Sequence, residues 1–244
     1  MPDNSPRFIR LSETDSTNKY MQMVATSENA ASGSVVVADY QTSGRGQMGN
    51  SWESEAGLNL TFSVLFLPTD LPAGKPFVIA EAVALSVKYT LDKHIPCVAV
   101  KWPNDIYYKD SKIAGILIEN VINQGKISQS VIGIGLNVNQ MDFRSPNSVS
   151  MRQITLINFD LMTILDNFLM IFNEFCRKIN NSKFDTIHAD YVNSLYRKEG
   201  FHLFSDSNGT FEAEIHDIEP NGHLILKKRD GSLSKYAFKE VSFH

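Results

Sequence analysis

The chain carries SVVVADYQTSGRGQMGNSW at residues 34–52, a β-branched run that leads directly into a glycine-rich loop. The run Ser34–Tyr40 predicts a strand, because valine side chains pack well on a pleated sheet. The three glycines of the loop are Gly44, Gly46 and Gly49. Glycine permits positive φ, and successive backbone N–H groups in such a loop can hold an anion. The segment therefore predicts a strand followed by an anion-binding loop.

Two side chains of the same loop suggest what that anion belongs to. Arg45 adds a planar, permanent charge suited to carboxylate or phosphate. Trp52 offers an aromatic face on which a nucleobase can stack. The alternative is a surface loop with a structural tryptophan. The spacing fits neither the phosphate loop of the NTPases nor the dinucleotide fingerprint, because no Gly-Lys-Ser/Thr follows and no helix is expected at its end.

A second signal is IGIGLNVN at residues 132–139, which alternates with a period of two. One face holds Ile132, Ile134, Leu136 and Val138, and the other holds Gly133, Gly135, Asn137 and Asn139. This pattern predicts a strand with one core face. Glycine on the other face favours the close approach of a ligand. Close packing of a helix on the sheet is the alternative.

Further polar groups stand at the ends of other predicted elements. A strand ends in KWPNDI (101–106), and KIAGILIE (112–119) begins with Lys112 at the mouth of an apolar strand. The Lys112 ammonium can reach a site at the edge of the sheet, or it can simply snorkel to solvent. In the same way, DSTN (15–18) can cap a helix or bind a polar ligand group.

The remaining pattern indicates an α/β protein with a β-rich C-terminal part. Helices are expected over 16–31, 75–91, 160–179 and 187–196, and a strand with one buried face over 59–67. After Tyr196, three hairpin-turn dipeptides, Asn208-Gly209, Asn221-Gly222 and Asp230-Gly231, separate the runs 211–218, 223–228 and 235–243. We therefore expect a domain over 1–195 and a small barrel over 196–244.

Composition narrows the class of protein. The chain has 244 residues, of which 43% are hydrophobic and 20% charged, with a formal net charge of −4. These values support a folded core and argue against nucleic-acid binding, which needs clustered basic residues. The apolar runs are too short to span a membrane, and no signal peptide is visible, so a cytoplasmic protein is expected. Cys97 and Cys176 have no metal-site spacing and are interpreted as packing residues.

The order and spacing of DSTN, QTSGRGxxGxxW, KWPNDI, KIAGILIE and GIGLNVN resemble those of the biotin–protein ligases, from about Phe8 to His244. This resemblance implies a mixed, largely antiparallel sheet flanked by helices, like that of class II aminoacyl-tRNA synthetases, plus a C-terminal SH3-like barrel. It also implies that biotin and ATP, with Mg²⁺, form biotinyl-5′-AMP, and that biotin passes to a lysine of a biotin carboxyl carrier domain. Because seven residues precede the first predicted strand, the branch without a DNA-binding domain is expected.

The resemblance also assigns roles to residues. Lys112 and Arg45 are the expected catalytic pair, with Asp105 beside the reacting groups. Trp52 and Asn137 are expected to hold adenine. The rest of the expected binding set is Ser16, Thr17, Asn18 and Gln41 for biotin, with Gly44, Gly46, Gln47 and Gly115 around the adenylate.

Three loop positions depart from the pattern of the resembled ligases. Gln47 stands where a second arginine is common in these ligases, and Met48 and Asn50 replace frequently basic residues. The lost charge weakens the expected hold on phosphate, unless Lys101 or a cation of the C-terminal barrel supplies it. A lipoate–protein ligase of the same fold and a non-catalytic biotin-binding regulator are the alternative functions.

Overall fold

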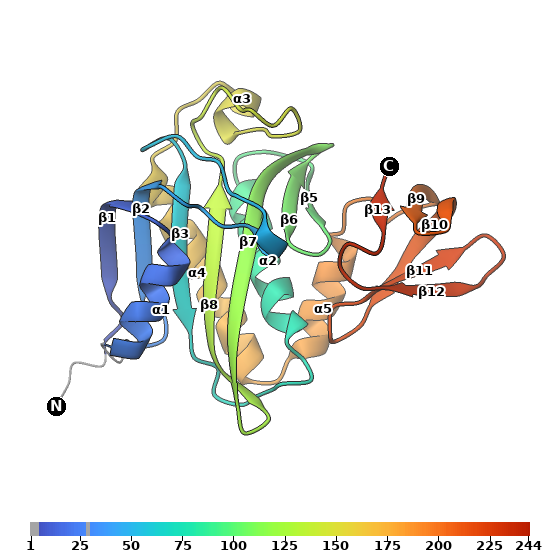
Figure 1. The fold of residues 1–244 in the computed structure, drawn as a ribbon, viewed down its shortest axis with the longest axis horizontal. Helices are drawn as coiled ribbons and strands as arrows, with labels where there is room; N and C mark the ends of the chain where they lie inside the picture. Colours follow the sequence, from blue (N-terminus) through green and yellow to red (C-terminus); the bar gives the residue numbers. More distant parts are fainter. Residues whose placement is uncertain (1–4, 28–29) are drawn as a thin grey trace.

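The computed structural model describes residues 5–27 and 30–244, and these form two β-sheets with helices on both faces of the larger one (Figure 1). The larger sheet comprises β1 (Phe8–Thr14), β2 (Val35–Gln41), β3 (Leu60–Phe66), β4 (Leu71–Pro72), β5 (Val98–Lys101), β6 (Asp105–Tyr108), β7 (Ser111–Asn123) and β8 (Lys126–Leu136). Its strand order is β1-β2-β3-β8-β7-β6-β5, with β4 paired to β8. Only β1 and β2 pair in parallel among these strands of the described chain. The expected mixed, largely antiparallel sheet is thus confirmed.

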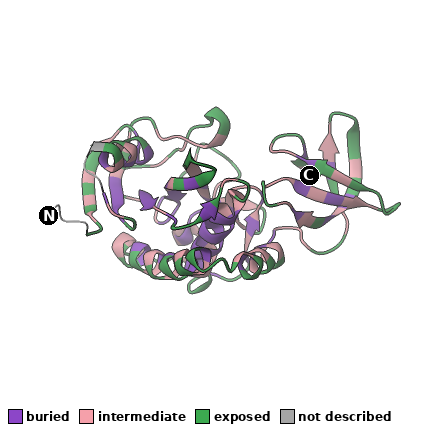
Figure 2. Cartoon of the chain, turned by 90° about the horizontal axis from the view of Figure 1, so that it is seen from below, coloured by how far each residue is buried: buried purple, intermediate pink, exposed green. Residues whose placement is uncertain are grey.

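Helices cover the two faces of this sheet unequally. Helix α1 (Thr17–Ser27) packs on one face, over β2, β3 and β8. Helices α2 (Phe77–Asp92), α4 (Leu161–Asn180) and α5 (Phe184–Asn193) pack on the other, as Figure 2 shows from below. A short α3 (Met151–Thr155) lies at the upper end of the sheet (Figure 1). No helix in the described part of the chain is long and apolar enough to cross a membrane.

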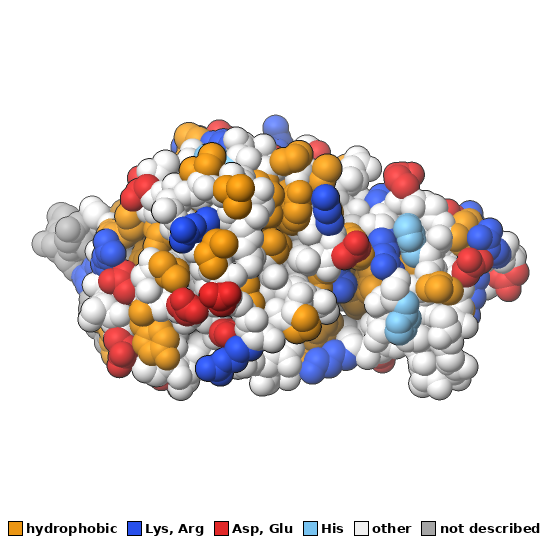
Figure 3. Space-filling view, turned by 90° about the horizontal axis from the view of Figure 1, so that it is seen from above, with side chains coloured by type: hydrophobic (Ala, Val, Ile, Leu, Met, Phe, Trp, Pro, Cys, Tyr) orange, Lys and Arg blue, Asp and Glu red, His pale blue; other side chains and the backbone are white. Residues whose placement is uncertain are grey.

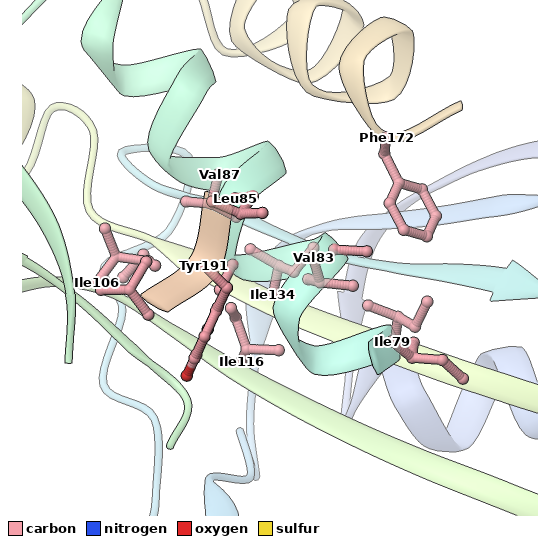
Figure 4. Packing of buried hydrophobic residues seen from close by; sticks show 14 of the residues in the cluster. Ile79, Val83, Leu85, Val87, Ile106, Ile116, Ile134, Phe172 and Tyr191 are labelled. Atoms are coloured by element: carbon pink, nitrogen blue, oxygen red, sulfur yellow. The ribbon is translucent and has the colours of Figure 1, made fainter. Parts of the chain in front are cut away.

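The main core lies between β3, β7 and β8 and the helices α2 and α4. Figure 4 shows Ile79 and Val83 of α2 close to Ile134 of β8 and Phe172 of α4. Burying such side chains is worth about 1.5–3 kcal/mol each, which is why the apolar face of IGIGLNVN fixes the register of β8. That face belongs to the core, as expected.

The strand at 59–67 differs from its prediction. Every residue of β3 is buried, whereas the alternating pattern predicts one exposed face. The polar side of β3 is covered by the start of α1, and the Ser63 hydroxyl lies 2.6 Å from Asn18 Oδ1. The pattern is misleading here because buried Thr and Ser with hydrogen-bond partners look the same in sequence as exposed ones.

The C-terminal sheet is built from β9 (His202–Asp206), β10 (Gly209–Ile218), β11 (Leu224–Lys228), β12 (Leu233–Tyr236) and β13 (Ser242–Phe243). Its order is β12-β11-β10-β9-β13, and all four pairings are antiparallel. The three turn glycines have positive φ, as their hairpin signals predict. The path of pairing is linear, so the closed SH3-like barrel is not confirmed, and the division at residue 196 stays a prediction.

Several boundaries differ from the sequence-based expectation. The strands β6 and β9 are not predicted, and the run 235–243 divides into β12 and β13 around a turn at Lys239. Helix α5 ends at Asn193, because Ser194 and Leu195 turn the chain toward β5, where Val100 N–H donates to Ser194 O. Of the helix predicted over 16–31, residues 28–29 lie outside the described residues.

Candidate functional site

A cavity of about 510 Å³ opens beside β7 and β8, between the glycine loop, the start of α1, the turn after β5 and the C-terminal segment 238–243. Every predicted site residue except Gly44 and Asn137 lines it. Other lining residues, which were not in the predicted set, include Asn50, Ser51, Lys101, Trp102, Asn104, Phe238, Lys239 and Phe243. The fold thus brings together all five quoted motifs, from Ser16 of DSTN to Gly135 of IGIGLNVN.

One end of the cavity, formed by Thr17, Asn18 and Gln41, is neutral and tightly hydrogen-bonded. The backbone N–H and the hydroxyl of Thr17 donate to Gln41 Oε1, at 2.8 and 3.1 Å. Asn18 Nδ2 donates to Glu119 Oε2 at 2.8 Å, and the Asn18 side chain lies on Gly133 of β8. We call this group the neutral end. Its amides and hydroxyls are fixed before any ligand arrives, which favours directional binding of a neutral polar group.

Gly133 makes this arrangement possible. A Cβ at residue 133 would lie 2.2 Å from Asn18 Oδ1, a distance that real Cβ atoms do not reach. The close approach predicted from the glycine face is therefore made here by a side chain of α1. At this position the alternative interpretation, helix packing on the sheet, is the one that the structure supports.

Trp52 lies on a second pair of glycines, next to the neutral end. Gly115 and Gly135 are direct partners across β7 and β8, and a Cβ on Gly135 would lie 2.2 Å from Trp52 Cε2. The indole Nε1 is buried and has no hydrogen-bond partner among the described residues. The Lys112 ammonium lies 5.8 Å from the ring centroid. Trp52 thus lines the cavity beside a cation, and its stacking against a base stays a prediction.

The other end of the cavity, which we call the cationic end, is formed by Lys101, Asp105 and Lys112. Lys112 Nζ lies 2.6 Å from Asp105 Oδ1. Lys101 Nζ donates to the Tyr107 hydroxyl at 3.0 Å and lies 5.5 Å from the centroid of the Phe243 ring. Burial lowers the pKa of Lys101. Figure 3 shows Lys and Arg side chains beside the junction of the larger body with the C-terminal sheet.

Arg45 stands closer to the neutral end than its predicted partner Lys112 does. Its two terminal nitrogens donate to the two oxygens of Glu119, at 3.2 and 3.0 Å. Glu119 is a site residue that the sequence analysis missed, because it was interpreted as part of a strand. The Nε of Arg45 is buried and has no partner in the described chain, so this N–H donor is not satisfied by the protein and suits an anion.

Gly44 and Asn137 do not line the cavity. A Cβ on Gly44 would lie 2.7 Å from the Trp52 carbonyl oxygen, so Gly44 allows the loop to double back. Asn137 Nδ2 donates to Val149 O, and Val149 N–H in turn donates to Lys112 O. Asn137 Oδ1 is buried and unpartnered among the described residues. Asn137 thereby supports the backbone that carries Lys112, and its predicted contact with adenine stays a prediction.

The turn after β5 is positioned by Asn104. Its Nδ2 donates to Ile116 O at 2.7 Å, and Ile116 N–H donates to Asn104 O at 2.9 Å. This pair holds the turn against β7, so that Asp105 faces Lys112. Across the described residues, no group of three His, Cys, Asp or Glu is arranged to hold a metal ion.

Comparison with known proteins agrees with this geometry. Residues 11–137 match the model of the Biotin/lipoate A/B protein ligase family. The bifunctional ligase/repressor BirA of Bacillus spizizenii is 29% identical over 229 residues, covering 91% of this chain and 70% of that protein. The biotin–[acetyl-CoA-carboxylase] ligase of Mycobacterium tuberculosis is 35% identical over 137 residues, covering 53% of this chain and 48% of that protein.

A solved structure extends the likeness over nearly the whole chain. The biotin protein ligase from Aquifex aeolicus, in complex with biotin and ATP, superposes with a TM-score of 0.79 at 25% identity and covers 98% of both chains. The match to the family model takes in β2, the glycine loop and the strands beneath the cavity. The chain therefore belongs to the Biotin/lipoate A/B protein ligase family, and within it to the ATP-dependent biotin–protein ligases.

Proposed function

We propose that the protein activates biotin with ATP to give biotinyl-5′-AMP and then transfers biotin to a specific lysine of a biotin carboxyl carrier domain. One observation carries this proposal: a single cavity joins a fixed neutral end to a cationic end across an aromatic platform. Biotin has a neutral ureido head and an anionic carboxylate tail, and ATP has an aromatic base and an anionic triphosphate. The cavity offers a complementary group to each.

In the first step, a carboxylate oxygen of biotin attacks the α-phosphorus of ATP. The new O–P bond forms as the bond to the β-phosphate oxygen breaks, and pyrophosphate leaves. Both reactants are anions, so the protein must hold them together against repulsion. Lys112 is the residue assigned to the reacting oxygens, and Arg45 adds its free donor, because preorganised cations stabilise charge that develops in the transition state.

Asp105 has a distinct part in this scheme. Its Oδ1 lies 2.6 Å from Lys112 Nζ, and this pair holds the ammonium at the cavity edge. The arriving phosphate competes for the same ammonium, which costs the pair little because both groups are partly exposed. Asp105 is thus proposed to position Lys112, while Trp52 provides the stacking face for adenine.

In the second step, the amine of the acceptor lysine attacks the carbonyl carbon of biotinyl-AMP. A C–N bond forms, the bond from carbon to the phosphate oxygen breaks, AMP leaves, and the attacking nitrogen loses a proton. No covalent enzyme intermediate is needed in this scheme. The cavity is flanked by the glycine loop and by the segment 238–243, and both would shield the mixed anhydride from water. The segment 238–243 belongs to the proposed domain over 196–244, for which we propose an SH3-like fold.

Magnesium fits this site as an ion carried by ATP. Asp105 is the one carboxylate that lines the cavity within the described residues, which is too few ligands for a protein-held ion. The ion would neutralise charge on the phosphates. Asp105 is the residue that would contact it.

The decisive test is exchange of labelled pyrophosphate into ATP, with biotin or lipoate as the acid. We expect exchange with biotin alone, and a mass spectrum that contains biotinyl-AMP. Equal exchange with lipoate would instead assign the lipoate branch of the family, and no exchange with either acid would overturn the adenylation step. Addition of a carrier domain should then raise its mass by one biotinyl group, unless its acceptor lysine is replaced by alanine.

A further inference from the structure

The glycine loop carries less positive charge than the binding of a triphosphate requires. Within QTSGRGQMGNSW the only charged side chain is Arg45, and its terminal nitrogens are bound to Glu119. Gln47 lines the cavity as a neutral amide, and its Oε1 is buried without a partner among the described residues. A triphosphate placed against this loop needs further cations from elsewhere in the fold.

Four cationic side chains line the cavity in the described part of the chain, namely Arg45, Lys101, Lys112 and Lys239. Arg45 and Lys112 are paired with carboxylates, and Lys101 is enclosed by Tyr107 and Phe243. Lys239 differs from Arg45 and Lys112 because no carboxylate of the described residues lies within 4.0 Å of its ammonium, and it differs from Lys101 because its ammonium has only a 3.4 Å contact to a backbone oxygen. No carboxylate of the described residues therefore neutralises its positive charge.

Lys239 is also brought to the glycine loop by the fold. It lies in the turn between β12 and β13, where its φ of 70° is rare for a residue with a side chain. The turn is closed by Glu240 N–H donating to Ala237 O and by Ala237 N–H donating to Glu240 Oε2. From this turn Lys239 Nζ reaches Met48 O, at 3.4 Å. The contact joins positions 191 residues apart and places the ammonium at the backbone of Met48, the residue that follows Gln47, with both Gln47 and Lys239 lining the cavity.

On the basis of the proposed function, we infer that Lys239 binds the polyphosphate of ATP and supplies from the C-terminal sheet the charge that Gln47 lacks. The weak 3.4 Å contact to Met48 O leaves the ammonium two further donors for phosphate oxygens. Lys239 would then be a substrate-binding residue for ATP, with no contact to biotin. A merely structural tie between the C-terminal sheet and the loop would instead affect both substrates.

The test compares Lys239→Gln, Lys239→Arg and the control Lys227→Gln. Lys227 is a partly exposed lysine of the same sheet that pairs with Glu214 and does not line the cavity. Binding of α,β-methylene-ATP with Mg²⁺ is measured by calorimetry in the presence of biotin, so that turnover is not required. Pyrophosphate exchange is then measured with each substrate varied in turn.

We expect Lys239→Gln to weaken binding of the analogue and to raise KM for ATP by roughly 10- to 100-fold, the range for one hydrogen bond to a charged group. KM for biotin should change by less than about twofold, Lys239→Arg should retain most of the affinity, and Lys227→Gln should match the wild type. Added salt should weaken binding less in Lys239→Gln than in the wild type.

The other outcomes contradict either the role of Lys239 or the proposed function. Equal affinity of the wild type and a folded Lys239→Gln variant for the analogue would overturn the inference, and so would equal rises in KM for both substrates. A wild type that binds the analogue but shows no biotin-dependent exchange would overturn the proposed function while leaving the affinity comparison to decide on Lys239. If the wild type does not bind the analogue, the inference on Lys239 does not stand, whereas the exchange assay still decides on the proposed function.

Discussion

Gly133 and Gly135 lie two residues apart on the same face of β8, and each holds a different kind of side chain above it. Asn18 covers Gly133, and Trp52 covers Gly135, and in both cases an added Cβ would lie 2.2 Å from the nearest side-chain atom. Asn18 comes from α1 and is locked by hydrogen bonds to Glu119 and Ser63. Trp52 comes from the glycine loop, and its Nε1 has no partner in the described chain.

This difference separates a preformed part of the site from an adaptable one. The neutral end is held by hydrogen bonds that involve α1, β2, β3 and β7, so its geometry is set by the fold. Trp52 depends on the glycine loop, whereas Lys101, Asp105 and Lys112 of the cationic end stand on β5, β6 and β7, beside the C-terminal segment 238–243 that closes this side of the cavity. We therefore expect the neutral end to select biotin, and we expect Trp52 and the cationic end to adjust their positions when ATP binds.

The largest expected effect is that of Lys112→Ala. Loss of one preorganised cation beside the reacting oxygens should lower the rate of biotinyl-AMP formation by roughly 10²- to 10³-fold. Affinity for biotin should change little, because its head is assigned to the other end of the cavity. Single-turnover formation of the adenylate, measured by quenched flow, is the appropriate measurement.

Lys126→Ala is the control for that variant, because Lys126 is an exposed lysine that pairs with Asp70 at the far end of the β7–β8 hairpin. It should adenylate biotin at the wild-type rate. Full activity of a folded Lys112→Ala variant would show that Lys112 only reaches toward solvent, which is the other interpretation of a lysine at a strand end.

An intermediate effect is expected from the two glycines themselves. Gly133→Ala should displace Asn18 and raise KM for biotin, whereas Gly135→Ala should displace Trp52 and raise KM for ATP, each by roughly tenfold because overpacking costs about 1–3 kcal/mol. Gly74→Ala is a matched control, since no atom lies within 4 Å of its added Cβ and its φ is not positive. If both variants changed both constants equally, the two ends would not be separate sites.

The smallest effect should come from a contact far from the cavity. His188 of α5 contacts Glu81 of α2 at 2.7 Å and Asp217 of β10 at 2.9 Å, and so ties the C-terminal sheet to the body. The hydrogen bond to Glu81 is the main cause that raises the pKa of His188 to about 9. Because the folded-state pKa is raised, this contribution to stability is fully present below pH 6.5 and is lost as pH rises through about 9.

The wild type should therefore have a larger free energy of unfolding than His188→Gln, and this difference should be greater near pH 6 than near pH 10. Urea titrations at the two pH values can measure it. Tyr191, whose pKa is raised by burial and by Glu81, is the other titratable group packed there. Since the C-terminal sheet supplies Lys239, KM for ATP should rise with pH before KM for biotin does. A difference between the two proteins that stays constant with pH would contradict the assigned titration.

Sequence predicted the parts of the site that rest on strong local patterns. The alternation of IGIGLNVN identified the core face of β8, and the loop motif identified Arg45 and Trp52, both of which line the cavity. The contacts that sequence missed are non-local. Glu119 reads as an ordinary strand residue, and Lys239 lies in a turn with no recognisable motif, so only the folded chain brings them to the loop. Likewise, the buried Ser63 face of β3 has the period of an exposed one, because the pattern does not record what covers it.

The central claim is that biotin's neutral head occupies the end formed by Thr17, Asn18 and Gln41, while phosphate occupies the cationic end. A crystal structure with a non-hydrolysable sulfamoyl analogue of biotinyl-AMP tests this claim most directly. We predict ureido atoms within hydrogen-bonding distance of Asn18 or Gln41, and the sulfamoyl group, which replaces the phosphate, within about 4 Å of Lys112 Nζ. An analogue bound in the reverse direction, or held outside the cavity, would contradict the account.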